Sequence, residues 1–221
     1  MIRALVFDLD GVIADTEPLH YASFHELLAR WGIRIPWRIW STRYIGTGSS
    51  HIFEDIFRRH GISEDVSTWV KRRSELYARM LNEREVKPIR GFMRFFARAK
   101  RAGLRMAVVS GGHRAHIAAT LRKLGLEKEF VVVAIEDVRN RKPHPEGFLL
   151  AAKRLGVSPS ECLAFEDSVA GVEAAKRAGM LTIALTTSTT RSNLKKADAI
   201  VRHYADRRLW RLLKKLPICS A

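Results

Sequence analysis

Short apolar segments alternate with longer amphipathic segments along most of the chain. The apolar segments cover residues 4–7, 105–109, 130–134, 162–165, 181–185 and 199–201. Stretches with helical periodicity separate most of them, at 91–102, 114–124, 145–155 and 169–178. A glycine follows each of these stretches, at the position where a left-handed helix C-cap favours glycine. This alternation predicts βαβ units and therefore an α/β fold with a doubly wound parallel sheet.

One long segment interrupts the alternation directly after the first apolar run. Residues 16–87 contain no strand pattern, but residues 18–31, 50–59 and 64–82 have helical periodicity. A segment of this length is too long for a simple connection within a compact domain. We therefore expect residues 16–87 to form a helical cap domain, inserted into a core made of residues 1–15 and 88–221.

The composition is that of a globular protein, with 221 residues of which 47% are hydrophobic and 28% charged. No apolar run approaches the roughly 20 residues of a membrane helix, and the first segment does not have the pattern of a signal peptide. Two cysteines, Cys162 and Cys219, make no disulfide framework, and Cys162 is expected in the core. These features favour a cytoplasmic protein without a membrane partner.

The formal net charge of +16 is high for a chain of this size. It suits anionic substrates, and it also raises the alternative of nucleic-acid binding. The basic residues are scattered, and the sequence has no helix-turn-helix, zinc-finger or RNA-binding aromatic pattern, which argues against a nucleic-acid partner. The segment from Asp206 onward is basic and amphipathic, and we expect it to pack on the core. A monomer is the simplest expectation.

Polar residues follow four of the predicted strands at the point where each strand ends. Asp8 and Asp10 follow the first strand, and Ser110 follows the second. Lys142 comes after the third strand, and the fourth ends in Glu166 and Asp167. In open α/β sheets ligands bind outside the carboxyl ends of the strands, so these residues are predicted to share one site. Each of these groups alone has a structural alternative, as a helix cap or a turn.

The carboxylates require a cation if they are to lie together. Asp8, Glu166 and Asp167 would otherwise repel one another and at least one pKa would rise. Mg²⁺ prefers oxygen ligands, a few carboxylates and a substrate phosphate. With Mg²⁺ and Lys142 to stabilise the phosphoryl oxygens, Asp8 is predicted to attack phosphorus and form an aspartyl-phosphate.

The remaining groups complete a phosphoryl-transfer site. The hydroxyl of Ser110 and the amides of Gly111 and Gly112 are expected to bind the phosphate. Asp10 is predicted to protonate the leaving oxygen and then to deprotonate the incoming water or hydroxyl. It must be a second carboxylate, because Asp8 carries phosphorus at that stage.

Four segments, "DLDGVIADTE", "VSGGHR", "KPHPEGF" and "FEDSVAGVEAAKRAG", resemble the four motifs of the haloacid dehalogenase-like hydrolases. The resemblance covers nearly the whole chain and points to the branch of β-phosphoglucomutase and phosphoglycolate phosphatase. It implies a Rossmann-like core with a cap of four or five helices. The presence of Asp10 argues against the dehalogenase and phosphonate-cleaving branches, so the resemblance implies phosphate-ester chemistry.

The resemblance also implies roles for the motif residues. Asp8 would be the nucleophile and a Mg²⁺ ligand, and Asp10 the acid/base whose backbone carbonyl also binds the metal. Asp167 would be a metal ligand, with Glu166 beside it binding directly or through water. Ser110 and Lys142 would hold the phosphate.

The cap residues leave the acceptor of the phosphoryl group open. Thr16 and His20 resemble hinge residues of β-phosphoglucomutase and are candidates for contact with the substrate. Where the mutases carry an arginine for a second phosphate, this chain has Ser49, although Arg43 or Arg79 would be able to replace it. The favoured prediction is a Mg²⁺-dependent phosphatase for a small phosphorylated metabolite, a sugar phosphate or phosphoglycolate. The alternatives are a hexose-phosphate mutase and an inactive nucleic-acid-binding module.

Overall fold

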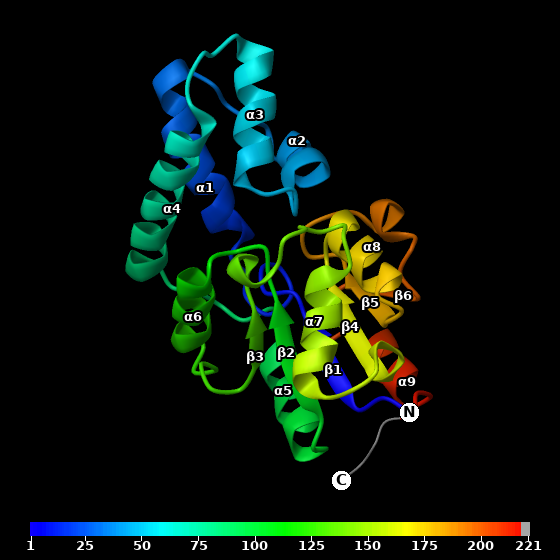
Figure 1. The fold of residues 1–221 in the computed structure, drawn as a ribbon. Coiled ribbons are helices and arrows are strands. Elements are labelled where there is room, and N and C mark those ends of the chain that lie inside the picture. The colour runs from blue at the N-terminus through cyan, green and yellow to red at the C-terminus, as the bar shows by residue number, and fades with distance from the viewer. Residues whose placement is uncertain (218–221) are drawn as a thin grey trace.

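The core of the protein is a six-stranded parallel sheet, seen in a computed structural model that describes residues 1–217 (Figure 1). The strands are β1 (Ala4–Phe7), β2 (Arg105–Val109), β3 (Val131–Val133), β4 (Cys162–Glu166), β5 (Leu181–Leu185) and β6 (Ala199–Val201). Their order in the sheet is β3-β2-β1-β4-β5-β6, and all neighbouring pairs are parallel. The order reverses between β1 and β4, which is where ligands bind in doubly wound sheets.

Helices cover both faces of this sheet, because its strands are apolar on both sides. In β1, Leu5 and Phe7 belong to one hydrophobic cluster and Ala4 and Val6 to another. The first cluster includes residues of α5 (Phe92–Arg101), α6 (Arg114–Lys123) and α9 (Arg207–Leu213). The second includes residues of α7 (Glu146–Leu155) and α8 (Val169–Arg177). The predicted Rossmann-like α/β core is therefore confirmed.

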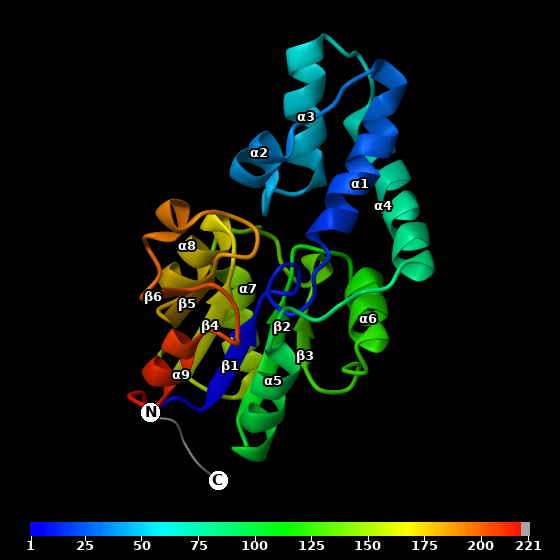
Figure 2. The ribbon, with the colours of Figure 1, turned by 180° about the vertical axis from the view of Figure 1, so that it is seen from behind.

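A group of helices inserted between β1 and α5 stands apart from the sheet (Figure 2). It consists of α1 (Glu17–Leu28), α2 (Trp37–Ile39), α3 (Ser49–His60) and α4 (Val66–Glu83), with a π-helical turn at Trp40–Tyr44. The helices enclose an aromatic cluster that includes Phe24, Trp40 and Phe53. The chain leaves and returns at one place, where Ala14 pairs with Pro88. The inserted helical cap is thus confirmed, while its boundaries at residues 16 and 87 stay a prediction.

Helix ends match the sequence-based expectation or differ from it by up to three residues. The helix expected at 64–82 begins at Val66, because the Asp65 side chain accepts hydrogen bonds from the amides of Ser67 and Thr68 and so caps it. The short helical turns over residues 37–44 were not expected, since they are too short to show a period. Further 3₁₀ turns are found at Ala29–Trp31, Ile135–Asp137, Pro159–Glu161 and Arg191–Leu194.

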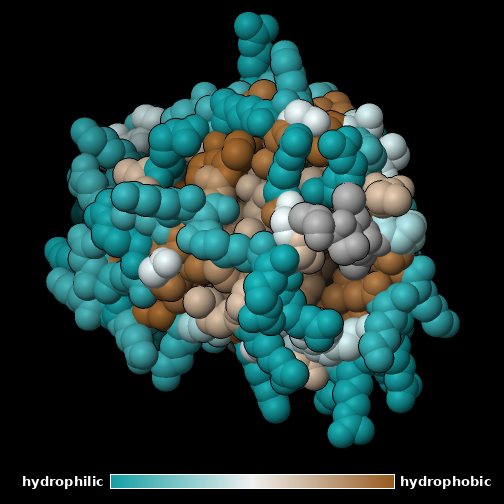
Figure 3. Space-filling model, turned by 90° about the horizontal axis from the view of Figure 1, so that it is seen from below, coloured by the Kyte–Doolittle hydropathy of each residue, from teal (hydrophilic) through white to brown (hydrophobic). Residues whose placement is uncertain are grey.

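Several other expectations concern the surface and the termini. Cys162 is buried in the core as expected, and Cys219 lies outside the described residues. Within residues 1–217, no helix is long and apolar enough to cross a membrane. Leu209 of α9 is fully buried, so the basic segment packs on the core as predicted. The face seen from below shows hydrophilic side chains projecting around smaller hydrophobic areas (Figure 3).

Candidate active site

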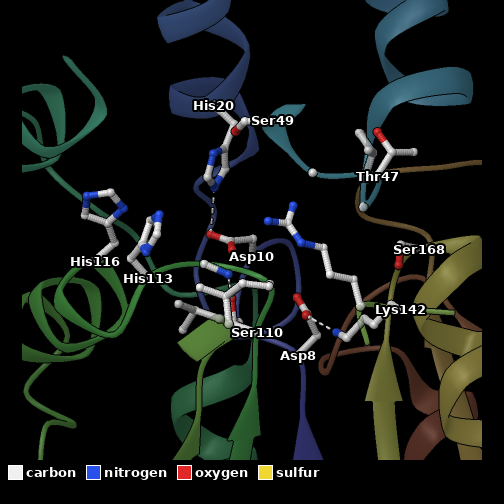
Figure 4. A pocket seen from close by; sticks show the side chains of 18 of the residues that line it. Asp8, Asp10, His20, Thr47, Ser49, Ser110, His113, His116, Lys142 and Ser168 are labelled. Carbon is white, nitrogen blue, oxygen red and sulfur yellow. Dashed lines mark hydrogen bonds and ion pairs between the residues drawn. The ribbon is translucent and has the colours of Figure 1, made fainter. Parts of the chain in front are cut away.

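The residues predicted to form the site gather at the carboxyl edge of the three central strands. The register aligns Phe7 of β1 with Val108 of β2 and with Phe165 of β4. Asp8 therefore emerges level with Val109, the residue before Ser110, on one side and with Glu166 on the other. Figure 4 shows Asp8, Asp10, Ser110 and Lys142 around one cavity, although they come from segments far apart in the sequence.

Lys142 is held between two carboxylates at the base of this cavity. Its Nζ donates hydrogen bonds to Oδ1 of Asp8 at 2.5 Å, to Oε1 of Glu166 at 2.6 Å and to the carbonyl of Val109 at 3.0 Å. Burial alone would lower the pKa of Lys142, but the charges of Asp8 and Glu166 outweigh it and hold that pKa above its usual range. Lys142 is therefore a fixed positive charge directly beside Asp8.

Glu166 is fully buried, and both of its carboxylate oxygens have partners. Oε1 accepts from Lys142, and Oε2 accepts from the amides of Asp167 and Ser168 and from the Ser168 hydroxyl. Gly171 lies so close that any Cβ there would overlap the Glu166 carboxyl. The contacts of Glu166 are thus with Lys142 and the loop carrying Asp167, and its binding of the metal stays a prediction.

Asp8 and Asp167 form a buried acidic pair that suits a divalent cation. Burial raises the pKa of both carboxyls well above the usual value, and neighbouring carboxylates raise it further. Within the described residues, Oδ2 of Asp8 and Oδ1 of Asp167 have no protein hydrogen-bond partner. No group of three or more acidic, histidine or cysteine side chains in residues 1–217 is arranged to hold a metal alone. Two carboxylates with waters and a phosphate are nevertheless an ordinary Mg²⁺ environment.

Gly11 makes room for Asp167 in this acidic pair. Its φ of +71° is in the left-handed region, and a Cβ would overlap both Asp167 Oδ2 and the Ser188 hydroxyl that donates to it. Thr187 also donates to the Gly11 carbonyl, at 2.6 Å. The glycine is therefore required for both backbone conformation and space.

We expect Gly11→Ala to lower the free energy of unfolding by about 3 kcal/mol or more and to reduce turnover, because overlap is added to backbone strain. Gly125→Ala is the matched control, since Gly125 has a φ of +70° and no other atom lies within 4 Å of the position that its new methyl group would take. Only the strain, roughly 1 kcal/mol, is expected there. Urea unfolding of both variants measures the difference, and equal losses would contradict a packing role for Gly11.

Asp10 is oriented by residues of the cap. Nε2 of His20 lies 3.1 Å from Oδ1 of Asp10, and the Thr16 hydroxyl also donates to Asp10. Burial alone would raise the pKa of Asp10, but attraction to His20 and the hydrogen bonds from His20 and Thr16 lower it to about 2. Thr16 is not among the residues lining the cavity, so contact of Thr16 with substrate stays a prediction. His20 does line it.

Arg73 of α4 contacts His20 on the side of the ring away from Asp10. The sequence analysis did not identify Arg73 as a site residue. Its guanidinium donates to Nδ1 of His20 and, at 3.0 Å, to the Ser23 hydroxyl. Because Nδ1 faces Arg73, the other ring nitrogen, Nε2, faces Asp10. Arg73 lies 4.6 Å from the ring centroid of Tyr77 and is itself buried. Its only sequence signal was helical spacing within the cap, which does not distinguish it from a surface arginine.

The turn formed by Ser110, Gly111 and Gly112 directly follows β2. The amide of Gly112 donates to the Ser110 hydroxyl at 3.1 Å, which holds this hydroxyl over the end of the strand. Ser110, Gly111 and Gly112 all line the cavity. The binding of phosphate by Ser110, Gly111 and Gly112 remains a prediction.

The cavity between core and cap has a volume of about 200 Å³, which suits a small metabolite. Its cap side includes Phe24, Trp40 and the loop before α3. Neither arginine considered as a second-phosphate ligand lines it. Arg43 pairs with Asp55 at 3.0 Å, and Arg79 with Glu26 at 3.6 Å.

Comparison with known proteins defines the class. A family model described as haloacid dehalogenase-like hydrolase matches residues 2–179. YhcW of Bacillus subtilis (strain 168) is 39% identical, over 81% of each chain, and fructose-1-phosphate phosphatase YqaB of Escherichia coli (strain K12) is 33% identical, over 80% of this chain and 92% of its own. The crystal structure of β-phosphoglucomutase from Clostridium difficile superposes with a TM-score of 0.84 at 26% identity, covering 97% of each chain.

The chain belongs to the haloacid dehalogenase-like hydrolase family. The resemblance inferred from the four motifs is thereby confirmed, as is the prediction of a phosphoric monoester hydrolase.

Proposed function

We propose that the protein is a Mg²⁺-dependent phosphatase that hydrolyses a small phosphorylated metabolite, such as a sugar phosphate, through a phosphorylated Asp8. The observation that carries the proposal is the placement of Lys142 at 2.5 Å from Asp8, with Asp10 and the cap residue His20 on the same cavity. The name of the relative YqaB, a fructose-1-phosphate phosphatase, supports the substrate class.

The first half of the proposed reaction transfers the phosphoryl group to the enzyme. A carboxylate oxygen of Asp8 attacks phosphorus, the bond from phosphorus to the ester oxygen breaks, and Asp10 gives its proton to the leaving oxygen. Lys142 and the turn from Ser110 to Gly112 stabilise the phosphoryl oxygens during this step. Mg²⁺ bound by Asp8, Asp167 and the Asp10 carbonyl would neutralise the remaining charge.

The second half returns the enzyme to its starting state. Asp10, now ionised, takes a proton from a water molecule, whose oxygen attacks phosphorus and displaces the Asp8 carboxylate. The low pKa of Asp10 in the resting protein, about 2, keeps it ionised for this step, since His20 and Thr16 stabilise the anion. Protonation for the first step then requires the His20 and Thr16 contacts to loosen when substrate enters.

A hexose-phosphate mutase is the second candidate, because the fold superposes closely on β-phosphoglucomutase. In that case a sugar hydroxyl replaces water as the acceptor of the phosphoryl group. A mutase must hold a bisphosphate in two orientations, and neither Arg43 nor Arg79 reaches the cavity to bind its second phosphate. Conversion of glucose 1-phosphate to glucose 6-phosphate, with a bisphosphate primer and slower phosphate release, would favour the mutase.

Removal of metal ions tests the proposed function directly. Phosphate release from an aryl phosphate and from a panel of sugar phosphates should fall at least about 100-fold after treatment with EDTA. Added Mg²⁺ should restore it, because Asp8 and Asp167 then no longer repel the substrate dianion. Circular dichroism before and after chelation controls for unfolding. Full activity of a folded, metal-free protein would contradict the proposal.

A further inference from the structure

Among residues 1–217, three arginine or lysine side chains line the cavity, and they differ in their partners. Lys142 donates hydrogen bonds to Asp8 and Glu166, and Arg73 donates to His20 and Ser23. Arg141 has no side-chain hydrogen bond or ion pair to any of residues 1–217 and is exposed. A positively charged side chain that lines a binding cavity and has no protein partner is available to bind an anionic ligand.

Arg141 also lies against the cap. A Cβ added to Gly48 would come within 2.9 Å of its Nη1, and one added to Gly46 within 2.9 Å of Ser168 in the core. These two glycines, at φ of +84° and +79°, bring the loop before α3 directly onto the core. Figure 4 shows Thr47 of this loop and Ser49, the first residue of α3, on the cap side of the cavity, across from Lys142 and Ser168. The Arg141 guanidinium is therefore at the junction of cap loop, core and cavity.

The two neighbouring basic side chains thus have different surroundings. Lys142 contacts Asp8, where the reacting phosphate is expected, whereas Arg141 reaches the cap loop, where the rest of the substrate must lie. The planar guanidinium group binds carboxylate or phosphate through two parallel hydrogen bonds. The two cap arginines considered from the sequence, Arg43 and Arg79, do not offer this charge, because they pair with carboxylates elsewhere.

We propose that Arg141 binds a second anionic group of the substrate, a carboxylate or a phosphate, and so makes the enzyme selective for phosphate esters that carry two anionic groups. The inference rests on the proposed phosphatase function and specifies its substrate class. Arg141 is a specificity residue in this proposal and has no part in the transfer of phosphorus.

The test compares ligands in matched pairs as competitors of p-nitrophenyl phosphate hydrolysis. Phosphoglycolate is paired with hydroxyethyl phosphate, and glucose 1,6-bisphosphate with glucose 1-phosphate, so that each pair differs by one anionic group. The first pair detects a carboxylate preference and the second a phosphate preference. Inhibition constants are measured for wild type, Arg141→Gln, Arg141→Lys and Arg139→Gln. The last is a control with the same loss of charge at an exposed position outside the cavity.

Wild type and Arg139→Gln should bind the doubly anionic member of at least one pair about tenfold or more tighter. Arg141→Gln should lose this preference without weaker binding of the singly anionic member, and Arg141→Lys should retain part of it. If wild type binds the two members of each pair with equal inhibition constants, the inference about Arg141 is overturned. Hydrolysis of the aryl phosphate in the same experiment would still support the proposed function. A uniform loss for all four ligands in Arg141→Gln would also overturn it, since it indicates that Arg141 merely anchors the cap loop. Absence of any hydrolysis by wild type would overturn both.

Discussion

Replacement of Asp8 by asparagine should lower phosphate release by at least about 10³-fold, because the amide keeps the shape of the carboxylate but cannot attack phosphorus. The hydrogen bond from Lys142 to Oδ1 can persist, so the protein should remain folded. The measurement is phosphate release from p-nitrophenyl phosphate with saturating Mg²⁺. In addition, protein denatured rapidly during turnover should carry hydroxylamine-sensitive phosphate in the wild type only.

Asp15→Asn is the matched control for this experiment. Asp15 is in the same segment and is exposed, and its side chain has no hydrogen bond or ion pair within the described part of the chain. The rate of phosphate release by Asp15→Asn should stay within about twofold of the wild-type rate. This result would separate the effect of losing one negative charge from the effect of losing the nucleophile. Rapid phosphate release by Asp8→Asn would rule out an aspartyl-phosphate at this position.

Lys142→Met is expected to damage both stability and turnover. Lys142 is the shared partner of two buried carboxylates, and its removal leaves Asp8 and Glu166 facing each other. Breaking a buried ion pair in this way costs about 3 kcal/mol or more. The rate should fall by roughly 10²–10³-fold, because a fixed positive charge beside the phosphoryl group is lost.

Urea unfolding without metal, at neutral pH, measures the stability loss, since bound Mg²⁺ would partly replace the missing charge. Lys153→Met on α7 is the control, because Lys153 is exposed and has no ion pair among the described residues. It should change stability by no more than about 0.5 kcal/mol. If Lys142→Met is as stable as this control, the role of Lys142 as the shared stabilising partner of Asp8 and Glu166 is wrong.

Much of the core site followed from the sequence because it depends on short-range order. Three apolar runs ended in Asp8, Ser110 and Glu166, and parallel strands bring such ends to one edge whatever the details of packing. Lys142 follows the end of a fourth run, β3, through a loop. The sequence pattern did not reveal that both carboxylate oxygens of Glu166 accept hydrogen bonds, one from Lys142 and the other from the loop after β4. That depends on hydrogen-bond geometry within 3 Å, which strand periodicity does not encode.

The sequence by itself determined the α/β alternation, the inserted helical segment and the set of candidate site residues, because each is a local property of hydrophobic period and residue order. The tertiary structure alone decided that Arg73 supports His20, that Arg43 and Arg79 turn away, and that Arg141 faces the cap loop. The physical reason is that a cap residue meets the core only through the packing of helices on each other. That packing determines which face of each helix lines the cavity, and the pattern of residues along the chain does not predict this orientation.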